Sequence, residues 1–172
     1  DTSVDHETRR TVAHERQFPR PVYTGEERGK VLIVEDEESA RMPIIDALEG
    51  LGYEVIHESD GAKVSRRVVE EKPDVVLLDL TLPGSDGFQV LRKLKGDPAT
   101  RSTSVIIMSS STDAHELATS MTLGARDYIA KPSHMGDLQS RVKRAFSASR
   151  ARMRQAERAV ARARARLRGN QS

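Results

Sequence analysis

The chain has 172 residues, a length typical of one ordinary domain with tails. It contains no cysteine, which excludes disulfides, thiolate metal sites and cysteine nucleophiles. No apolar run approaches the roughly 20 residues that span a bilayer, and no secretory segment opens the chain, so we expect a cytoplasmic protein.

The net charge of +2 conceals an uneven distribution along the chain. Residues 1–30 are balanced, residues 31–140 carry 11 basic and 19 acidic side chains, and residues 141–172 carry 11 basic and one acidic. We therefore expect a flexible leader or linker at 1–29, a folded acidic domain at 30–147 and an Arg-rich helical extension at 148–172.

Short aliphatic runs alternate with helical spacing throughout the acidic part of the chain. In chain order the pattern predicts a strand at 31–34, a helix around 40–51, a strand at 53–57, a helix at 62–71, a strand at 75–78, a helix around 88–94, a strand at 105–108, a helix around 117–123, a strand at 128–130 and a helix from 138. Runs buried on both faces and strict strand–helix alternation predict an α/β, doubly wound, five-stranded parallel sheet. Pro43 falls inside the first predicted helix, where we expect a late helix start or a kink.

Acidic residues follow two of these strands. Glu35 and Asp36 come after the first strand and Asp79 after the third. Such strands are neighbours in a doubly wound sheet, so the three carboxylates should converge at the edge where ligands bind. Close carboxylates repel unless one protonates or a cation binds, and an all-oxygen site favours a hard ion such as Mg²⁺.

Two further polar residues follow the fourth and fifth strands. Ser109 could donate a hydroxyl to a phosphoryl oxygen, and Lys131 could place a positive charge at the same edge. A carboxylate such as Asp79 can act as a nucleophile and form an acyl phosphate. Each residue alone has a simpler interpretation: Asp36 as a helix cap, Asp79 as a turn residue, Ser109 as a loop residue and Lys131 as a solvated side chain. Their joint order favours the chemical interpretation.

Four segments carry a family resemblance: Val34-Glu35-Asp36, the stretch from Leu78 to Gly87 (LDLTLPGSDG), Met108-Ser109-Ser110, and the stretch from Gly124 to Pro132 (GARDYIAKP). With these motifs the chain resembles the receiver domain of two-component response regulators over about residues 29–147. The resemblance implies a flavodoxin-like receiver fold with an extended C-terminal helix. It also implies a signalling switch, not a turnover enzyme, that accepts phosphate from a histidine kinase or a histidine phosphotransfer protein.

The resemblance assigns roles around a magnesium ion. Asp79 would be the phosphorylation site. Asp36 and Asp79 would ligate Mg²⁺ directly, together with the backbone carbonyl of Thr81, and Glu35 would act through water. The acidic pair is Glu-Asp where the family more often has Asp-Asp, which hints at altered metal geometry or affinity.

The resemblance also assigns a switch. Ser109 would be the switch hydroxyl and Tyr128 the aromatic side chain that changes rotamer with it. Lys131 would bridge the acidic centre and the phosphoryl group, and its bond to Pro132 would be cis.

The basic tail shows a three-four spacing that predicts a coiled-coil seam. Its positions are Phe146, Ser149, Met153, Ala156, Val160, Ala163 and Leu167. In a parallel homodimer Arg152 could pair with Glu157 of the other copy. A solvated single helix, or a stalk leading to an output domain outside this chain, remain alternatives.

Two other functions are compatible with the sequence. The domain could be a scaffold that is never phosphorylated, as the Glu35 departure hints, or the Arg-rich tail could bind nucleic acid through phosphate contacts. The effector downstream of the domain cannot be named from the sequence.

Overall fold

The computed structural model describes residues 28–131 and 133–169. Its elements, in chain order, are β1 (Lys30–Val34), α1 (Glu38–Glu49), β2 (Glu54–Glu58), the 3₁₀ turn η1 (Gly61–Lys63), α2 (Val64–Glu71), β3 (Val75–Asp79), β4 (Thr81–Leu82), β5 (Ser85–Asp86), α3 (Gly87–Gly96), β6 (Ser104–Ser109), α4 (Ala114–Thr122), β7 (Asp127–Ala130) and α5 (Met135–Gly169). Residues 1–27 of the leader predicted at 1–29 and the bond to Pro132 lie outside these residues, so both remain predictions, whereas Gly29 is buried in the folded domain.

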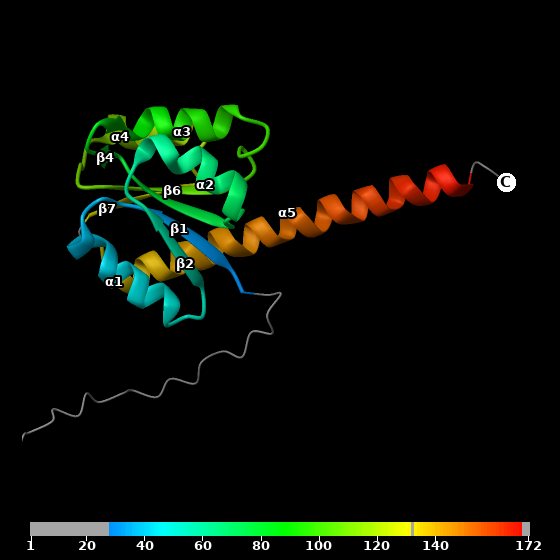
Figure 1. Ribbon diagram of the computed structural model, residues 1–172, viewed down its shortest axis with the longest axis horizontal. Coiled ribbons are helices and arrows are strands. Elements are labelled where there is room, and N and C mark those ends of the chain that lie inside the picture. The colour runs from blue at the N-terminus through cyan, green and yellow to red at the C-terminus, as the bar shows by residue number, and fades with distance from the viewer. Residues whose placement is uncertain (1–27, 132, 170–172) are drawn as a thin grey trace, which may run out of the picture.

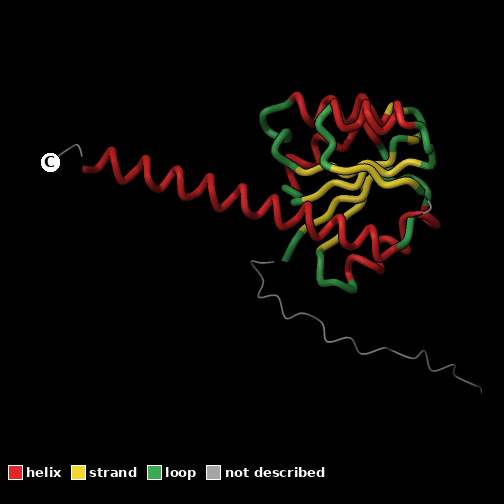
Figure 2. The backbone as a smooth tube through the Cα atoms, turned by 180° about the vertical axis from the view of Figure 1, so that it is seen from behind, coloured by secondary structure: helices red, strands yellow, loops and turns green. Residues whose placement is uncertain are grey.

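Five parallel strands form the central sheet in the order β2-β1-β3-β6-β7. Figure 1 shows α2, α3 and α4 on one face of this sheet and α1 with the first part of α5 on the other, and Figure 2 shows the same layers from behind. The α/β doubly wound sheet predicted from the sequence is confirmed.

The central strands owe their aliphatic composition to burial on both faces. β3 and β6 are buried throughout, whereas the edge strand β2 is only half-buried. Alternate residues of each strand contribute to two separate cores, one under α2 and α3 and one under α1 and α5. Leu138, Val142 and Ala145 attach the first part of α5 to the second core.

The structure departs from one expectation about the helices. α1 begins at Glu38 and contains Pro43, so of the two alternatives raised by the proline the late start is wrong and the kink remains a prediction. The helix predicted from the spacing of Leu117 and Met121 is confirmed as α4, and both side chains are more than 40% exposed.

The extended C-terminal helix is present as a single element, α5, that runs well beyond the sheet (Figure 1). The first two positions of the predicted seam belong to the folded body: Phe146 packs on Tyr53 with ring centroids 5.7 Å apart, and Ser149 is buried. All residues from 151 to 169 are exposed. No helix in the described part of the chain is both long and apolar enough to span a membrane.

Candidate functional site

Three carboxylates meet at the carboxyl edge of the sheet. Glu35 and Asp36 follow β1, Asp79 ends β3, and these strands pair directly. Oxygen atoms of all three side chains lie within 4.8 Å of one another. Glu35 is 1% exposed and Asp79 5% exposed, whereas Asp36 is open to solvent. The convergence expected from strand order is thus present.

Lys131, directly after β7, is the cation of this cluster. Its Nζ donates to Asp79 Oδ2 at 2.9 Å and to Glu35 Oε2. Burial raises the pKa of Glu35, although the hydrogen bond from Lys131 partly opposes that shift. Burial alone would lower the pKa of Lys131, but hydrogen bonds to Glu35 and Asp79 outweigh it and raise the pKa. Lys131 therefore stays charged.

A tight hairpin continues from the acceptor strand. The backbone N–H of Thr81 donates to Asp79 Oδ1 at 2.8 Å, and β4 pairs with β5 through a turn at Gly84, whose φ is +67°. At Gly87, a Cβ would lie 2.5 Å from the Cα of Leu80, so only glycine allows α3 to begin so close to the strand. Both glycines therefore shape the loop beside Asp79. The role of the Thr81 carbonyl as a metal ligand remains a prediction.

Ser109 ends β6 beside the acceptor strand and is buried, but its hydroxyl is engaged elsewhere. It donates to Glu116 Oε1, and the same atom accepts a hydrogen bond from the Tyr128 hydroxyl at 2.9 Å. The Ser109 Oγ also accepts from the backbone N–H of Ser111 at 3.1 Å. Burial raises the pKa of Tyr128, to which Glu116 adds. The structure therefore joins both predicted switch residues through a third.

Glu116 was not recognised from the sequence. It lies in the first turn of α4, where an acidic residue is explained by the helix dipole alone. Glu116 follows Ser109 by seven residues. Its carboxylate reaches the end of β6 only because α4 packs back against β6 and β7. That placement depends on the tertiary structure, and no local signal reports it.

The donor set fits a hard divalent cation. Among the residues that the structure describes, Lys131 is the cation that ion-pairs with carboxylates of this group of three, so negative charge is in excess in the cluster. Carboxylate oxygens are the ligands that Mg²⁺ prefers, and a divalent ion would cancel that excess. The acidic edge therefore has both the charge and the ligand type that magnesium requires.

Comparison with known proteins agrees with this geometry. The sequence model of the family named response regulator receiver domain matches residues 31–143, well over half of the chain. The chain belongs to the response regulator receiver domain family. The acidic cluster and the two polar residues beside it all lie inside that match: Glu35, Asp36, Asp79, Ser109 and Lys131.

Two curated relatives are longer than the region that they share with this chain. The phosphate regulon transcriptional regulatory protein PhoB of Pseudomonas aeruginosa is 35% identical over 113 residues, which are 66% of this chain and 49% of PhoB. The DNA-binding response regulator MtrA of Mycobacterium tuberculosis is 34% identical over 116 residues, 67% of this chain and 50% of MtrA. The receiver thus spans about half the length of these relatives.

Solved receiver structures share the fold. The BeF₃-activated N-terminal receiver domain of Klebsiella pneumoniae RstA aligns with a TM-score of 0.64 and 30% identity, over 69% of this chain and 98% of that one. The signal receiver domain of a signal transduction histidine kinase from Syntrophus aciditrophicus aligns with a TM-score of 0.64 and 34% identity, over 70% and 91%. The likeness therefore covers almost the whole of each receiver but not all of this chain.

Proposed function

We propose that this receiver accepts a phosphoryl group on Asp79, in a magnesium-dependent reaction, from a histidine kinase or a histidine phosphotransfer protein. Response regulators are signalling proteins and not turnover enzymes, so the transfer serves to set a state of the domain. The observation that carries the proposal is the buried Asp79 carboxylate, held between Lys131 and the Thr81 amide beside two further acids. The proposal places the protein in the cytoplasm.

The chemistry follows from the charges around the acceptor. An Asp79 oxygen attacks the phosphorus, a new O–P bond forms, and the bond to the donor's imidazole nitrogen breaks, so that the donor leaves with the electron pair. Glu35, Asp36, Asp79 and the Thr81 carbonyl would hold magnesium, which would neutralise charge on the transferring group. Lys131 already contacts Asp79 and would then contact a phosphoryl oxygen as well.

The switch would follow from the new anion. Ser109 would turn its hydroxyl toward the phosphoryl group, and Tyr128 would reposition with it. Because both now donate to Glu116, the movement would break two hydrogen bonds at the start of α4. The face made by α4, β7 and α5 would change, and α5 would carry the change toward a downstream effector protein.

The test uses aspartates at the two ends of one strand. Asp79 ends β3 and Asp74 directly precedes it, and both are buried. The full chain is incubated with acetyl phosphate and Mg²⁺, and incorporated phosphate is measured by intact-mass spectrometry. We expect wild type and Asp74→Asn to be labelled and Asp79→Asn to remain unlabelled. Equal labelling of Asp79→Asn would show that the acceptor is another residue.

A further inference from the structure

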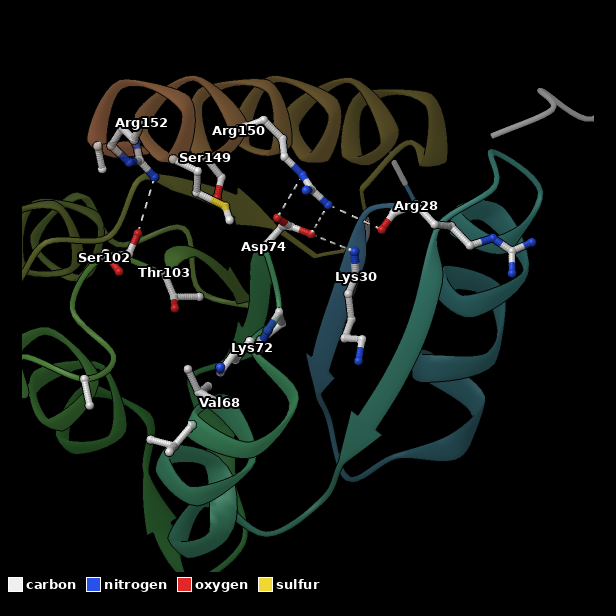
Figure 3. Close-up of a pocket in the computed structure, with 15 residues that line it drawn as sticks. Arg28, Lys30, Val68, Lys72, Asp74, Ser102, Thr103, Ser149, Arg150 and Arg152 are labelled. Atoms are coloured by element: carbon white, nitrogen blue, oxygen red, sulfur yellow. Dashed lines mark hydrogen bonds and ion pairs between the residues drawn. The ribbon is translucent and has the colours of Figure 1, made fainter. Parts of the chain in front are cut away.

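A cavity in the described part of the chain lies far from the acidic cluster. It has a volume of about 750 Å³ and opens at the amino-terminal edge of the sheet, where α5 leaves the body (Figure 3). Its walls come from the end of α2, from the loop between α3 and β6, and from α5. Nothing in the phosphoryl-transfer mechanism uses this cavity.

Three of the five cations that line this cavity, Lys30, Arg150 and Arg152, are already engaged. Arg150 Nε lies 3.3 Å from Asp74 Oδ1, and Lys30 Nζ lies 3.2 Å from Glu71 Oε2. Arg152 donates to the Ser104 hydroxyl at 2.9 Å. The cavity therefore offers a ligand both positive charge, from the exposed Arg28 and Lys72, and apolar surface: Val69 is 47% exposed and Met153 is 48% exposed. This mixture argues for an acidic protein segment with apolar side chains as the occupant, because a small anion would leave Val69 and Met153 exposed.

The apolar surface continues from the cavity along α5. Met153 and Ala156 line the cavity, and Val160, Ala163 and Leu167 follow at the same three-four spacing. Val160 is 50% exposed and Leu167 70% exposed. At 3.6 residues per turn these five side chains occupy an arc of roughly 80°. A stripe this narrow is the seam of a coiled coil and not the broad face of a core helix.

Charge and size together select the partner for this stripe. Residues 151–169 carry seven arginines and one acidic residue, Glu157, a net charge of +6. A second copy would bring another +6 along the seam, and small residues, Ala156 and Ala163, would face each other and bury little surface. An acidic helix with large apolar residues avoids both problems, because its side chains fill the space above the alanines. Nucleic acid would satisfy the arginines but would leave the apolar stripe exposed.

We propose that α5 and the adjoining cavity form a docking surface for an amphipathic helix of another protein, with large apolar residues at its seam and acidic residues on both flanks. Its apolar seam lies along Met153, Val160 and Leu167, and one end reaches the cavity beside Val69. This surface stands independently of phosphorylation at Asp79.

The test uses a designed peptide and the full 172-residue chain. A fluorescent four-heptad peptide with Leu at the seam and Glu on both flanks is monomeric by charge repulsion, and its binding is followed by anisotropy. We expect Val160→Gln/Leu167→Gln to weaken binding at least about tenfold, since two apolar contacts are lost. Ala151→Gln/Ala165→Gln, on the opposite side of the helix, should bind like wild type.

Three results would overturn the proposal. One is equal binding of a scrambled peptide of the same composition, or of one with Lys on its flanks. Another is self-association of the chain, in analytical ultracentrifugation, that Val160→Gln/Leu167→Gln abolishes, because the seam would then belong to a second copy. The third is tight duplex DNA binding that the peptide does not displace.

A separate observation concerns Glu116, and it rests on the proposed function. One atom, Glu116 Oε1, accepts hydrogen bonds from both Ser109 and Tyr128. A serine has one hydroxyl hydrogen. While Ser109 donates that hydrogen to Glu116, it cannot donate it to a phosphoryl group. We infer that Glu116 is a positioning residue that holds the switch in its unphosphorylated arrangement.

Beryllofluoride with Mg²⁺ serves as the probe for the held switch. We expect Glu116→Gln to bind it about tenfold more tightly, because a charge-assisted hydrogen bond no longer has to break. The gain should vanish in a Ser109→Ala background, which separates it from a general effect of charge. Glu38→Gln, in the first turn of α1, controls for removal of one acid.

The outcomes distinguish failure of the proposed phosphorylation at Asp79 from failure of the positioning role of Glu116. Wild-type protein that does not bind beryllofluoride contradicts the proposed function. Binding by wild type with no gain in Glu116→Gln, or a gain that persists without Ser109, contradicts only the role of Glu116.

Discussion

The two ends of β3 place the same residue type in opposite surroundings. Asp74, at the amino end, ion-pairs with Arg150 and accepts a hydrogen bond from the Lys30 amide at 2.9 Å. Asp79, at the carboxyl end, shares a single lysine with Glu35 and lies close to Asp36. One aspartate is therefore balanced and the other is left with excess negative charge.

This difference suggests that Asp74 stabilises the fold, whereas Asp79 is suited to bind a ligand. A carboxylate with matched partners contributes to stability and has little left to offer a ligand. A carboxylate among other acids contributes less to stability and gains by binding a cation or a phosphoryl group. If that division holds, substitutions at the two ends of β3 should have different effects on phosphoryl uptake and on stability.

Loss of the cation at the carboxyl edge should slow phosphoryl uptake. Lys131→Ala removes the positive charge that contacts Asp79, and we expect uptake from acetyl phosphate to fall about a hundredfold. Initial rates from intact-mass measurements check this. Lys30→Ala, at the other edge, should label at the wild-type rate, and a comparable loss there would remove the distinction between the edges.

Neutralising the two aspartates should affect stability in opposite ways. We expect Asp74→Asn to lower the free energy of unfolding by about 2 kcal/mol, because Arg150 and the Lys30 amide lose a charged partner. Asp79→Asn should leave stability unchanged or raise it, since it relieves repulsion with Glu35 and Asp36. Urea unfolding without Mg²⁺ measures both. A larger loss for Asp79→Asn would contradict the comparison.

The two glycines of α3 offer a matched pair at the two edges. Gly87→Ala forces a Cβ against the backbone of Leu80, and we expect a loss of about 1.5 kcal/mol in stability. Gly96→Ala meets nothing within 4 Å and should be neutral or slightly stabilising. Chemical denaturation compares the free energies of unfolding of the two variants. Equal values would mean that the loop beside Asp79 moves to accommodate the added methyl group without a cost in stability.

Magnesium should stabilise the fold through the carboxyl edge alone. At ten times its dissociation constant we expect a gain of about 1.4 kcal/mol in the free energy of unfolding. The gain should disappear in Asp36→Asn and persist in Asp74→Asn, as followed by urea unfolding with and without Mg²⁺. If Asp36→Asn retains the full gain, the ion binds elsewhere.

The sequence indicated the strands and the acidic edge because their signals are local. The apolar runs at β1, β3 and β6 end at the residues that carry the chemistry, and parallel order places those ends together. The hairpin β4–β5 was missed because strands of two residues have no periodicity to detect. The late start of α1 predicted from Pro43 was wrong, because the packing of Ile44 and Leu48 in the core outweighs the backbone hydrogen bond that a proline cannot donate.

The sequence by itself determined which residues are apolar, where the strands end and which side chains could perform phosphoryl chemistry. Only the tertiary structure decided that Glu116 joins Ser109 to Tyr128, that Phe146 and Ser149 belong to the body, and that the apolar stripe of α5 opens into a cavity. The physical reason is that periodicity records how one element faces its surroundings. Contacts between α4 and β7, or between α5 and the end of α2, depend on how separate elements pack.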